Sequence, residues 1–410
     1  MNQGIIVYTH QGEYRVITRI AHDSIATSAS AAEAIQAAVD ACGDEGGQVL
    51  IEQGRYPLAR PIRLRSRVRL SGAGRGTRLE VAGEAGVLLE SLDSAEVADL
   101  AIVAAKGSAA QAGLILDGCG DCQATNVFAG GFAGHGIWLR NHSFLCTIRG
   151  CSAAGNAKSN IFLDDLADKA RSGEYIPNLV ADCTVYGGGV GIETKRTIVA
   201  NIVGCCVFQT KGTGFHVHST SNSVVITGCR TFQVGKHAVL LEDTHEFNLS
   251  SNIFCWHLED GVVIRNANWG TITGNEIIDT GSYNSNVPDR TAGWDTLPKD
   301  LPRYSGLKLL NAQGYSVTGN TIFNWPVCPP MEYGIYEDAA SFKNNFTGNN
   351  VNLYDKEAVL SLGRESASCN NVGYAERPHQ RSSDEGRGMA RFYQTFLTGL
   401  TDTFVANQLA

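Results

Sequence analysis

A short phrase that recurs along the chain constrains its fold more than any other feature. The phrase is an apolar residue, a variable residue, usually Gly, and then Cys or Asn. It ends at Cys151, Cys183, Cys205, Cys229, Asn252, Asn275, Asn320 and Asn349. The intervals between these ends are 32, 22, 24, 23, 23, 45 and 29 residues. A fixed period of this kind is typical of a solenoid, in which successive repeats stack on one another.

A second phrase runs in step with the first. It is a Gly, Ala or Asn followed by three mostly apolar residues, and it begins at Gly136, Asn160, Gly191, Gly214, Ala238, Gly261, Gly306 and Gly334. Two short strands in a repeat of about 23 residues, each bounded by Gly or Asn, predict stacked β-coils. The repeat is too short for a propeller blade and contains no helical period. We therefore expect an all-β fold, a single-stranded right-handed parallel β-helix.

The repeat predicts one domain over residues 46–371, with insertions at 164–178 and 280–305. An N-terminal segment, 1–45, contains an Ala-rich amphipathic stretch, Ser28 to Cys42, that predicts a capping helix. Residues 372–410 predict a polar linker and a helical tail that caps the fold or joins subunits. The 43 % of hydrophobic residues and 18 % of charged residues suit a long buried column rather than a disordered chain.

Charge and hydropathy exclude several classes of partner. The formal net charge of −8 argues against nucleic acid or an anionic membrane surface as the main partner. No run of apolar residues is long enough to cross a membrane. The first residues lack the basic segment and apolar core of a signal peptide.

The cysteines indicate a reducing compartment. Four of them occupy the ladder position that other repeats give to Asn, where small buried groups need no oxidation. Cys119 and Cys122 form a lone CxxC pair without the second pair that a zinc site requires. We expect buried free thiols, no metal ion, no cofactor and a cytoplasmic protein.

The second phrase also predicts which side chains face outward. Its second and fourth positions are apolar in nearly every repeat, so the third position and the one two residues beyond it point away from the core. These positions bring acids, imidazoles, cations and aromatic rings to one face, a set suited to carbohydrate binding. The candidate substrate-binding residues are Trp138, Arg140, Lys195, His216, His218, Glu242 and Arg265, with Trp294 from the larger insertion. The alternative is an ordinary solvated sheet face.

Two carboxylates are the candidate catalytic residues. Asp182 stands in the column before the ladder residue, where the other repeats quoted above carry Gly or Ser, and the same repeat supplies the outward-facing Glu193. A carboxylate where packing favours Gly is a local violation of the kind that concentrates at functional sites. Asp182 is alternatively a turn residue that accepts backbone hydrogen bonds. Two carboxylates that flank a bond are the usual requirement of glycosidic chemistry.

The segment from Asp182 to Glu193 resembles the segment of the inulin fructotransferases and difructose dianhydride hydrolases (glycoside hydrolase family 91) that carries two catalytic acids eleven residues apart. As in that family, four regular repeats follow the Glu before a long insertion rich in Pro, Gly and aromatic residues. The N-terminal stretches beginning at Gly46 and Val68 resemble the entry coils of pectate-lyase-type β-helices, which supports the fold alone.

The resemblance implies a homotrimer that acts on an oligosaccharide or cyclic disaccharide and cleaves or forms a fructosyl bond, by intramolecular transfer or hydrolysis. Glu193 would be the general acid/base, with a pKa raised by partial burial, and Asp182 its partner. Two alternatives remain open. A polysaccharide lyase or C5-epimerase would act on uronate-containing glycans with Lys195, His216, His218 or Arg265. A non-catalytic trimeric β-helix would bind glycans without turnover.

Overall fold

The computed structural model describes residues 4–164, 177–281, 302–324 and 330–375. It divides the chain into two compact units, which meet between Asn201 and Ile202 inside strand β22 (Ala200–Val203). Each unit is described by itself. Most of the two predicted insertions, Trp294 and the predicted helical tail lie outside the described residues.

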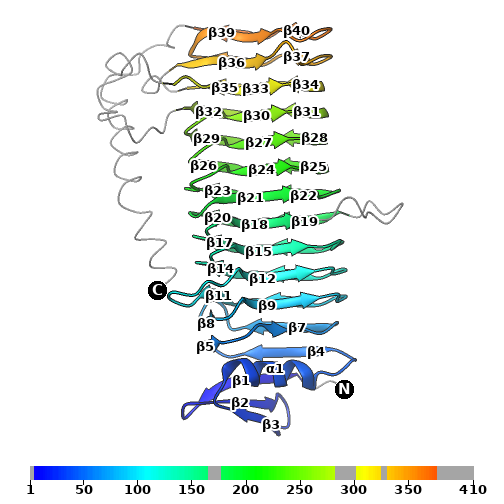
Figure 1. Ribbon diagram of the computed structural model, residues 1–410, viewed down its shortest axis with the longest axis vertical. Helices are drawn as coiled ribbons and strands as arrows, with labels where there is room; N and C mark the ends of the chain where they lie inside the picture. The colour runs from blue at the N-terminus through cyan, green and yellow to red at the C-terminus, as the bar shows by residue number, and fades with distance from the viewer. Residues whose placement is uncertain (1–3, 165–176, 282–301, 325–329, 376–410) are drawn as a thin grey trace, which may run out of the picture. The chain divides into compact units, whose positions relative to one another are not determined.

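The N-terminal unit begins with three antiparallel strands and one helix (Figure 1). The strands are β1 (Ile5–His10), β2 (Glu13–Thr18) and β3 (Ser24–Ser28), and the helix is α1 (Ala31–Ala41). The hydroxyl of Ser30 caps α1 by accepting a hydrogen bond from the backbone of Glu33 at 3.4 Å. The predicted helix is therefore confirmed, and its buried face, which includes Ile35 and Val39, packs against these strands.

The rest of the N-terminal unit is a stack of coils, each made of three parallel strands in a fixed order. Sheet A contains β4 (Gly47–Ile51), β7 (Val68–Gly72), β10 (Glu96–Ala98), β13 (Gln123–Thr125), β16 (Thr147–Arg149) and β19 (Asn178–Ala181). Sheet B contains β5 (Gly54–Leu58), β8 (Thr77–Val81), β11 (Ala101–Ala104), β14 (Phe128–Gly130), β17 (Ser152–Ala154) and β20 (Thr184–Tyr186). Sheet C contains β6 (Ile62–Arg63), β9 (Ala85–Glu90), β12 (Ala112–Asp117), β15 (His135–Arg140), β18 (Ser159–Asp164) and β21 (Val190–Lys195).

The C-terminal unit repeats the same order of strands. Its sheet A contains β25 (Asn222–Thr227), β28 (His245–Ser250), β31 (Asn268–Thr273), β34 (Gln313–Thr318), β37 (Asn345–Thr347) and β40 (Ala367–Cys369). Sheet B contains β23 (Cys206–Phe208), β26 (Arg230–Val234), β29 (Ile253–His257), β32 (Glu276–Thr280), β35 (Thr321–Phe323), β38 (Asn350–Asn352) and β41 (Val372–Tyr374). Sheet C contains β24 (Phe215–His218), β27 (Val239–Glu242), β30 (Val262–Arg265), β33 (Leu307–Leu310), β36 (Met331–Glu337) and β39 (Tyr354–Ser361).

The stacking explains the repeating apolar positions. Val97, Ala124, Ile148 and Val180 are aligned on successive strands of sheet A, and all are buried. Each coil thus places the same kind of side chain above its neighbour, so the apolar column continues from coil to coil. The predicted parallel β-helix is confirmed. The sequence had indicated two strands in each coil, however, and the strands of sheet B are a third set. Several of these strands are only three residues long, too short to show an alternating pattern.

The ladder residues follow the corner between sheets A and B. Asn275 donates from Nδ2 to Oδ1 of Asn320 at 2.9 Å and to the backbone oxygen of Leu249 at 2.9 Å. Asn252 donates in turn to Oδ1 of Asn275 at 2.9 Å. The ladder cysteines are buried and form no disulfide among the described residues, and the thiol of Cys151 donates to the backbone oxygen of Ala124 at 3.3 Å. The sequence predicted buried thiols at these positions, and their burial is confirmed. No helix among the described residues is both long and apolar enough to cross a membrane.

Candidate functional site

The outward side of sheet C in the N-terminal unit changes from apolar to polar along the stack. We call it the N-terminal face and define it by the outward side chains of β9, β12, β15, β18 and β21. Its central row, aligned by the strand register, is Leu88, Ile115, Trp138, Phe162 and Glu193. The first two pack with Ala85 and Ala112, and Trp138 packs against this cluster. The apolar end of the row therefore leads, through two aromatic rings, to one carboxylate.

Glu193 lies in a polar corner bounded by aromatic rings. The hydroxyl of Ser159 donates a hydrogen bond to its Oε2 atom, and Phe162 stands opposite Glu193 on the adjacent strand. The imidazole of His135 stacks on Phe162 with ring centroids 4.5 Å apart, and Trp138 stacks on Phe162 at 6.0 Å. Glu193 is half-buried, so it combines a partly shielded carboxylate with access to solvent.

Two buried nitrogen atoms beside this corner have no hydrogen-bond partner among the described residues. They are Nδ1 of His135 and Nε1 of Trp138. His135 is 6 % exposed, and burial lowers its pKa to about 4, so the ring is neutral near pH 7. An unpaired buried polar atom costs about 1–3 kcal/mol, which a bound group or water that pairs with it recovers. The two nitrogens therefore indicate a place for a polar ligand.

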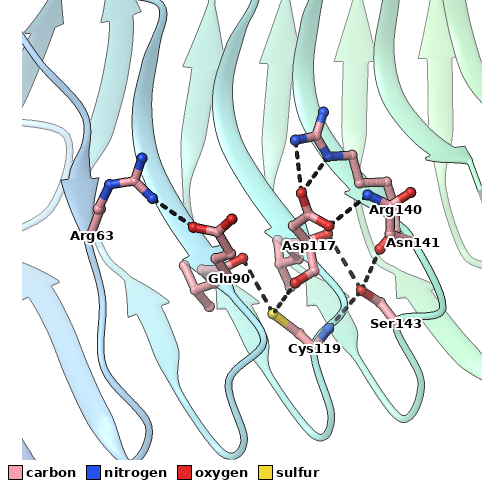
Figure 2. A network of polar contacts seen from close by, with 9 residues as sticks. Arg63, Glu90, Asp117, Cys119, Arg140, Asn141 and Ser143 are labelled. Atoms are coloured by element: carbon pink, nitrogen blue, oxygen red, sulfur yellow. Dashed lines mark hydrogen bonds and ion pairs between the residues drawn. The ribbon is translucent and has the colours of Figure 1, made fainter.

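A row of charged residues borders the N-terminal face (Figure 2). Arg63 pairs with Glu90 at 2.6 Å, and Asp117 accepts from Arg140 at 2.7 Å and from Asn141 at 2.7 Å. Arg140 also lies over the ring of Trp138, 4.4 Å from its centroid. The predicted binding residues Trp138 and Arg140 are thus brought together, and the guanidinium of Arg140 is already engaged by a carboxylate.

The row continues on the strands nearest Glu193. Asp164 accepts two hydrogen bonds from Arg196, at 2.6 and 3.2 Å. Lys195 stands beside Asp164 in the register. Neither Lys195 nor Lys158, which lies next to Ser159 in the sequence, forms an ion pair in the part of the chain that the structure describes. Lys158 is close enough to His135 to help lower its pKa, after the larger effect of burial.

Asp182 lies at a different part of the coil from Glu193. It occupies the corner between β19 and β20 with a φ of 55°, and its carboxylate is 3.5 Å from Arg149. Asp99, Asn126 and Gly150 occupy the same corner of earlier coils, also with positive φ. Asp and Asn tolerate this left-handed conformation better than most residues. Strand β20 separates Asp182 from β21, so the structure does not bring Asp182 and Glu193 together within the chain.

The C-terminal unit gathers four other predicted residues on the outward side of its sheet C. The rings of His216 and His218 stack with centroids 4.2 Å apart. Nε2 of His216 is 2.9 Å from Oε1 of Glu242, and Arg265 is 3.3 Å from Oε2 of the same carboxylate. The four predicted residues therefore form one cluster, in which His216 and Arg265 share the carboxylate of Glu242.

Sequence reasoning missed His135 and Ser159, because it treated the second phrase as the start of the strand. Each of these residues precedes the phrase by one position. A Cβ atom added to the following residue, Gly136, would point toward the interior, against Ala153 and Asn156. This corner turns the preceding side chain outward. The polar residue before Gly136 and before Asn160 could have indicated these site residues. Strict alternation along the strand, however, assigns that position to the inner side.

The comparisons with known proteins agree with the architecture. Residues 85–254 match the family described as "Right handed beta helix region". Among curated proteins, no sequence match was found. The mannuronan C-5 epimerase AlgE6 A-module of Azotobacter vinelandii has a similar structure, with a TM-score of 0.67 and 18 % identity, over 85 % of this chain and 96 % of that one.

Two further solved structures are similar over most of this chain. The catalytic unit of a GH87 α-1,3-glucanase from Streptomyces thermodiastaticus has a TM-score of 0.54 and 12 % identity, over 85 % of this chain and 67 % of that one. A tailspike protein of the E. coli bacteriophage HK620 has a TM-score of 0.56 and 13 % identity, over 83 % and 67 %. At these identities the likeness concerns the fold, and the chain has the right-handed parallel β-helix that these carbohydrate-processing and tailspike proteins share.

Proposed function

We propose that this chain is a carbohydrate-active enzyme that binds a glycan on the N-terminal face and uses Glu193 for proton transfer. The observation that carries the proposal is the corner formed by Glu193, Ser159 and the stacked rings of His135, Phe162 and Trp138. Aromatic rings offer apolar faces to sugar rings, and sugar hydroxyls would supply the partners that the buried Nδ1 of His135 and Nε1 of Trp138 lack among the described residues.

A second carboxylate on the same face suits glycosidic chemistry. Asp164 lies two residues beyond Phe162, the register partner of Glu193. With strands about 4.8 Å apart and a rise of about 3.3 Å per residue, the Cα atoms of Asp164 and Glu193 are about 8 Å apart. Two carboxylates on one face are what glycosidic chemistry requires. We therefore assign Asp164, held by Arg196, the role of partner carboxylate that the sequence had given to Asp182.

The finer assignment is a fructosyl bond, cleaved or formed as in inulin fructotransferases or difructose dianhydride hydrolases. Its support is the sequence resemblance around Glu193. The homotrimer and the cytoplasmic location belong to the same proposal. Proton transfer between carboxyl groups and sugar oxygens needs no metal ion, so we expect turnover to survive chelation.

A second candidate is a lyase or C5-epimerase that acts on uronate-containing glycans. The observation that favours it is the pair of cations, Lys195 and Lys158, that are not neutralised by acids on the N-terminal face. Uncompensated cations beside a binding surface attract a carboxylate substrate. The similar A-modules of Azotobacter vinelandii are described as mannuronan C-5 epimerases, which agrees with this alternative.

A substrate panel separates these candidates. Purified protein is incubated with inulin, difructose dianhydrides, neutral glucans and oligouronates, and the products are identified by mass spectrometry and NMR. Cleavage or cyclisation of fructosides supports the finer assignment, whereas a C5 inversion or an unsaturated uronate supports the second candidate. Under the second candidate, Lys195→Gln raises KM for the uronate more than it lowers kcat. Binding of a glycan without any product would contradict the proposal of an enzyme.

A further inference from the structure

A second group of titratable residues lies in the C-terminal unit, where strands of its sheet C begin. His237, Asp260 and Ser305 occupy equivalent positions, two residues before the paired residues Val239, Val262 and Leu307. Glu259 precedes Asp260, and Lys308 follows on β33. None of these residues belongs to the site proposed above.

The imidazole of His237 lies between two hydrogen-bond acceptors. Its Nδ1 atom is 3.2 Å from the backbone oxygen of Asp260, and its Nε2 atom is 3.2 Å from Oε2 of Glu259. A backbone oxygen only accepts, so the Nδ1 atom must carry a hydrogen. A neutral ring would then turn the Nε2 lone pair toward the carboxylate. The contact is favourable only when a further proton lies between Nε2 and Glu259.

The neighbouring carboxylate of Asp260 is engaged by two donors. Oδ1 of Asp260 is 2.8 Å from Nζ of Lys308 and accepts a hydrogen bond from the backbone of Ser305 at 2.7 Å. The formal charges of the group therefore cancel, because Glu259 and Asp260 are matched by Lys308 and the extra proton. Ser305 is fully buried, and its Oγ atom has no partner among the described residues. This hydroxyl is a free donor and acceptor within the group.

We propose that His237 and Glu259 hold one proton between them and form an acid site for an uncharged, hydroxyl-rich ligand such as a segment of neutral glycan. The proton is offered to a ligand oxygen, and the Oγ atom of Ser305 binds a ligand hydroxyl. The cancelled charges favour a neutral ligand, since a carboxylate would meet Glu259 and Asp260 without a spare cation.

The surroundings of His237 act on its pKa in opposite directions. Burial is the largest effect and brings the pKa below its ordinary value, whereas the carboxylates of Asp260 and Glu259 raise it and Arg265 lowers it. The fully buried His257 is also close to His237, and its own pKa falls to about 3, so it stays neutral. Burial disfavours a fully charged imidazolium. The backbone oxygen of Asp260 and the carboxylate of Glu259 disfavour a ring that lacks a proton on either nitrogen. A proton shared with Glu259 satisfies both requirements.

The test is ¹⁵N NMR of the full chain with labelled histidines, with the His237 signals assigned by His237→Gln. At pH 7 the Nε2 signal of His237 should lie away from the position of a bare ring nitrogen. Glu259→Ala should move it to that position and leave Nδ1 protonated. Glu246→Gln, which changes an exposed acid on β28, is the matched control and should leave both signals unchanged. A bare Nε2 nitrogen in the wild-type protein would overturn the shared proton.

Ligand class is tested in the same samples by titration with cellohexaose, maltohexaose and hexamannuronate. A saturable shift of the His237 signals by a neutral hexasaccharide, weakened about tenfold by Ser305→Ala as for one lost hydrogen bond, supports the site. A shift by hexamannuronate alone, or by none of the three, would overturn the assigned ligand. Because the readout is at His237, failure of this site is distinguishable from failure of Glu193 in turnover.

Discussion

The hydroxyl of Ser159 donates a hydrogen bond to the carboxylate of Glu193 from the neighbouring strand. Glu193 alone is an outward-facing acid on a sheet, a common feature of a solvated surface. The contact with Ser159 fixes the carboxyl group beside the rings of Phe162 and His135. A positioned carboxyl group next to an aromatic surface is what proton transfer to a bound sugar requires.

Glu193→Gln keeps the shape of the side chain but removes its proton chemistry. We expect turnover on the true substrate to fall by roughly 10²–10⁴-fold, as for a lost general acid or base, with little change in thermal stability. Glu90→Gln is the control, because this acid lies on the same sheet and pairs with Arg63 at 2.6 Å. Near-normal turnover in Glu193→Gln would remove Glu193 from the mechanism.

Asp182 should behave as a corner residue. Its φ of 55° suits Gly and Asn, so Asp182→Gly and Asp182→Asn should keep both stability and turnover close to wild type. Asp182→Val should cost about 1–2 kcal/mol of unfolding free energy, measured in urea, because a branched side chain resists the left-handed conformation. A loss of turnover in Asp182→Asn as large as in Glu193→Gln would restore the pair of acids that the sequence suggested.

Acid should destabilise the fold in part through His135. Burial lowers the pKa of His135 from 6.5 to about 4. Between these two pH values the unfolded chain binds a proton on His135, whereas the folded chain does not. Stability from the neutral ring is present above pH 6.5 and is lost between pH 6.5 and 4, by up to about 3 kcal/mol. His135→Phe retains an aromatic ring without the titration. Between pH 7.5 and 4.5, urea unfolding of the wild type should lose about 2 kcal/mol more than the variant. Equal losses would show that His135 is solvated in the folded chain.

The ladder should tolerate the loss of a thiol better than the loss of an amide. Asn275→Ala removes donors to Asn320 and Leu249 and an acceptor for Asn252, and leaves buried groups unpaired. We expect a cost of about 3 kcal/mol or more in urea unfolding, against about 1 kcal/mol for Cys151→Ala. Similar costs for the two variants would contradict a ladder held by amide hydrogen bonds.

Cysteine labelling gives an independent check of burial. Cys369 is exposed, whereas the ladder thiols Cys151, Cys183, Cys205 and Cys229 are buried. Iodoacetamide should therefore modify Cys369 in the folded protein and reach the ladder only in denaturant, as followed by mass spectrometry of peptides. Modification of Cys151 at the same rate as Cys369 would mean that the column opens readily.

The sequence determined the fold because the same types of residue recur at equivalent positions of successive coils. The apolar column through Val97, Ile148 and Val180 and the ladder that includes Asn349 each recur at a fixed place in the coil. Their periodicity reveals which strand faces are buried without knowledge of distant contacts. The same periodicity placed Trp138, His216 and Glu242 on an outward face.

Tertiary structure decided which outward residues meet. The stacking of His135 on Phe162 and the pairing of Asp164 with Arg196 each join two coils, and the paired residues lie 27 and 32 positions apart in the sequence. The column that contains Asp182 looked like a site because its residue type was unusual, but the requirement there is a backbone angle that Gly, Asn and Asp can all meet. Periodicity specifies the direction of a side chain, whereas corner geometry and strand register specify its neighbours, and the chemistry of a site depends on the neighbours.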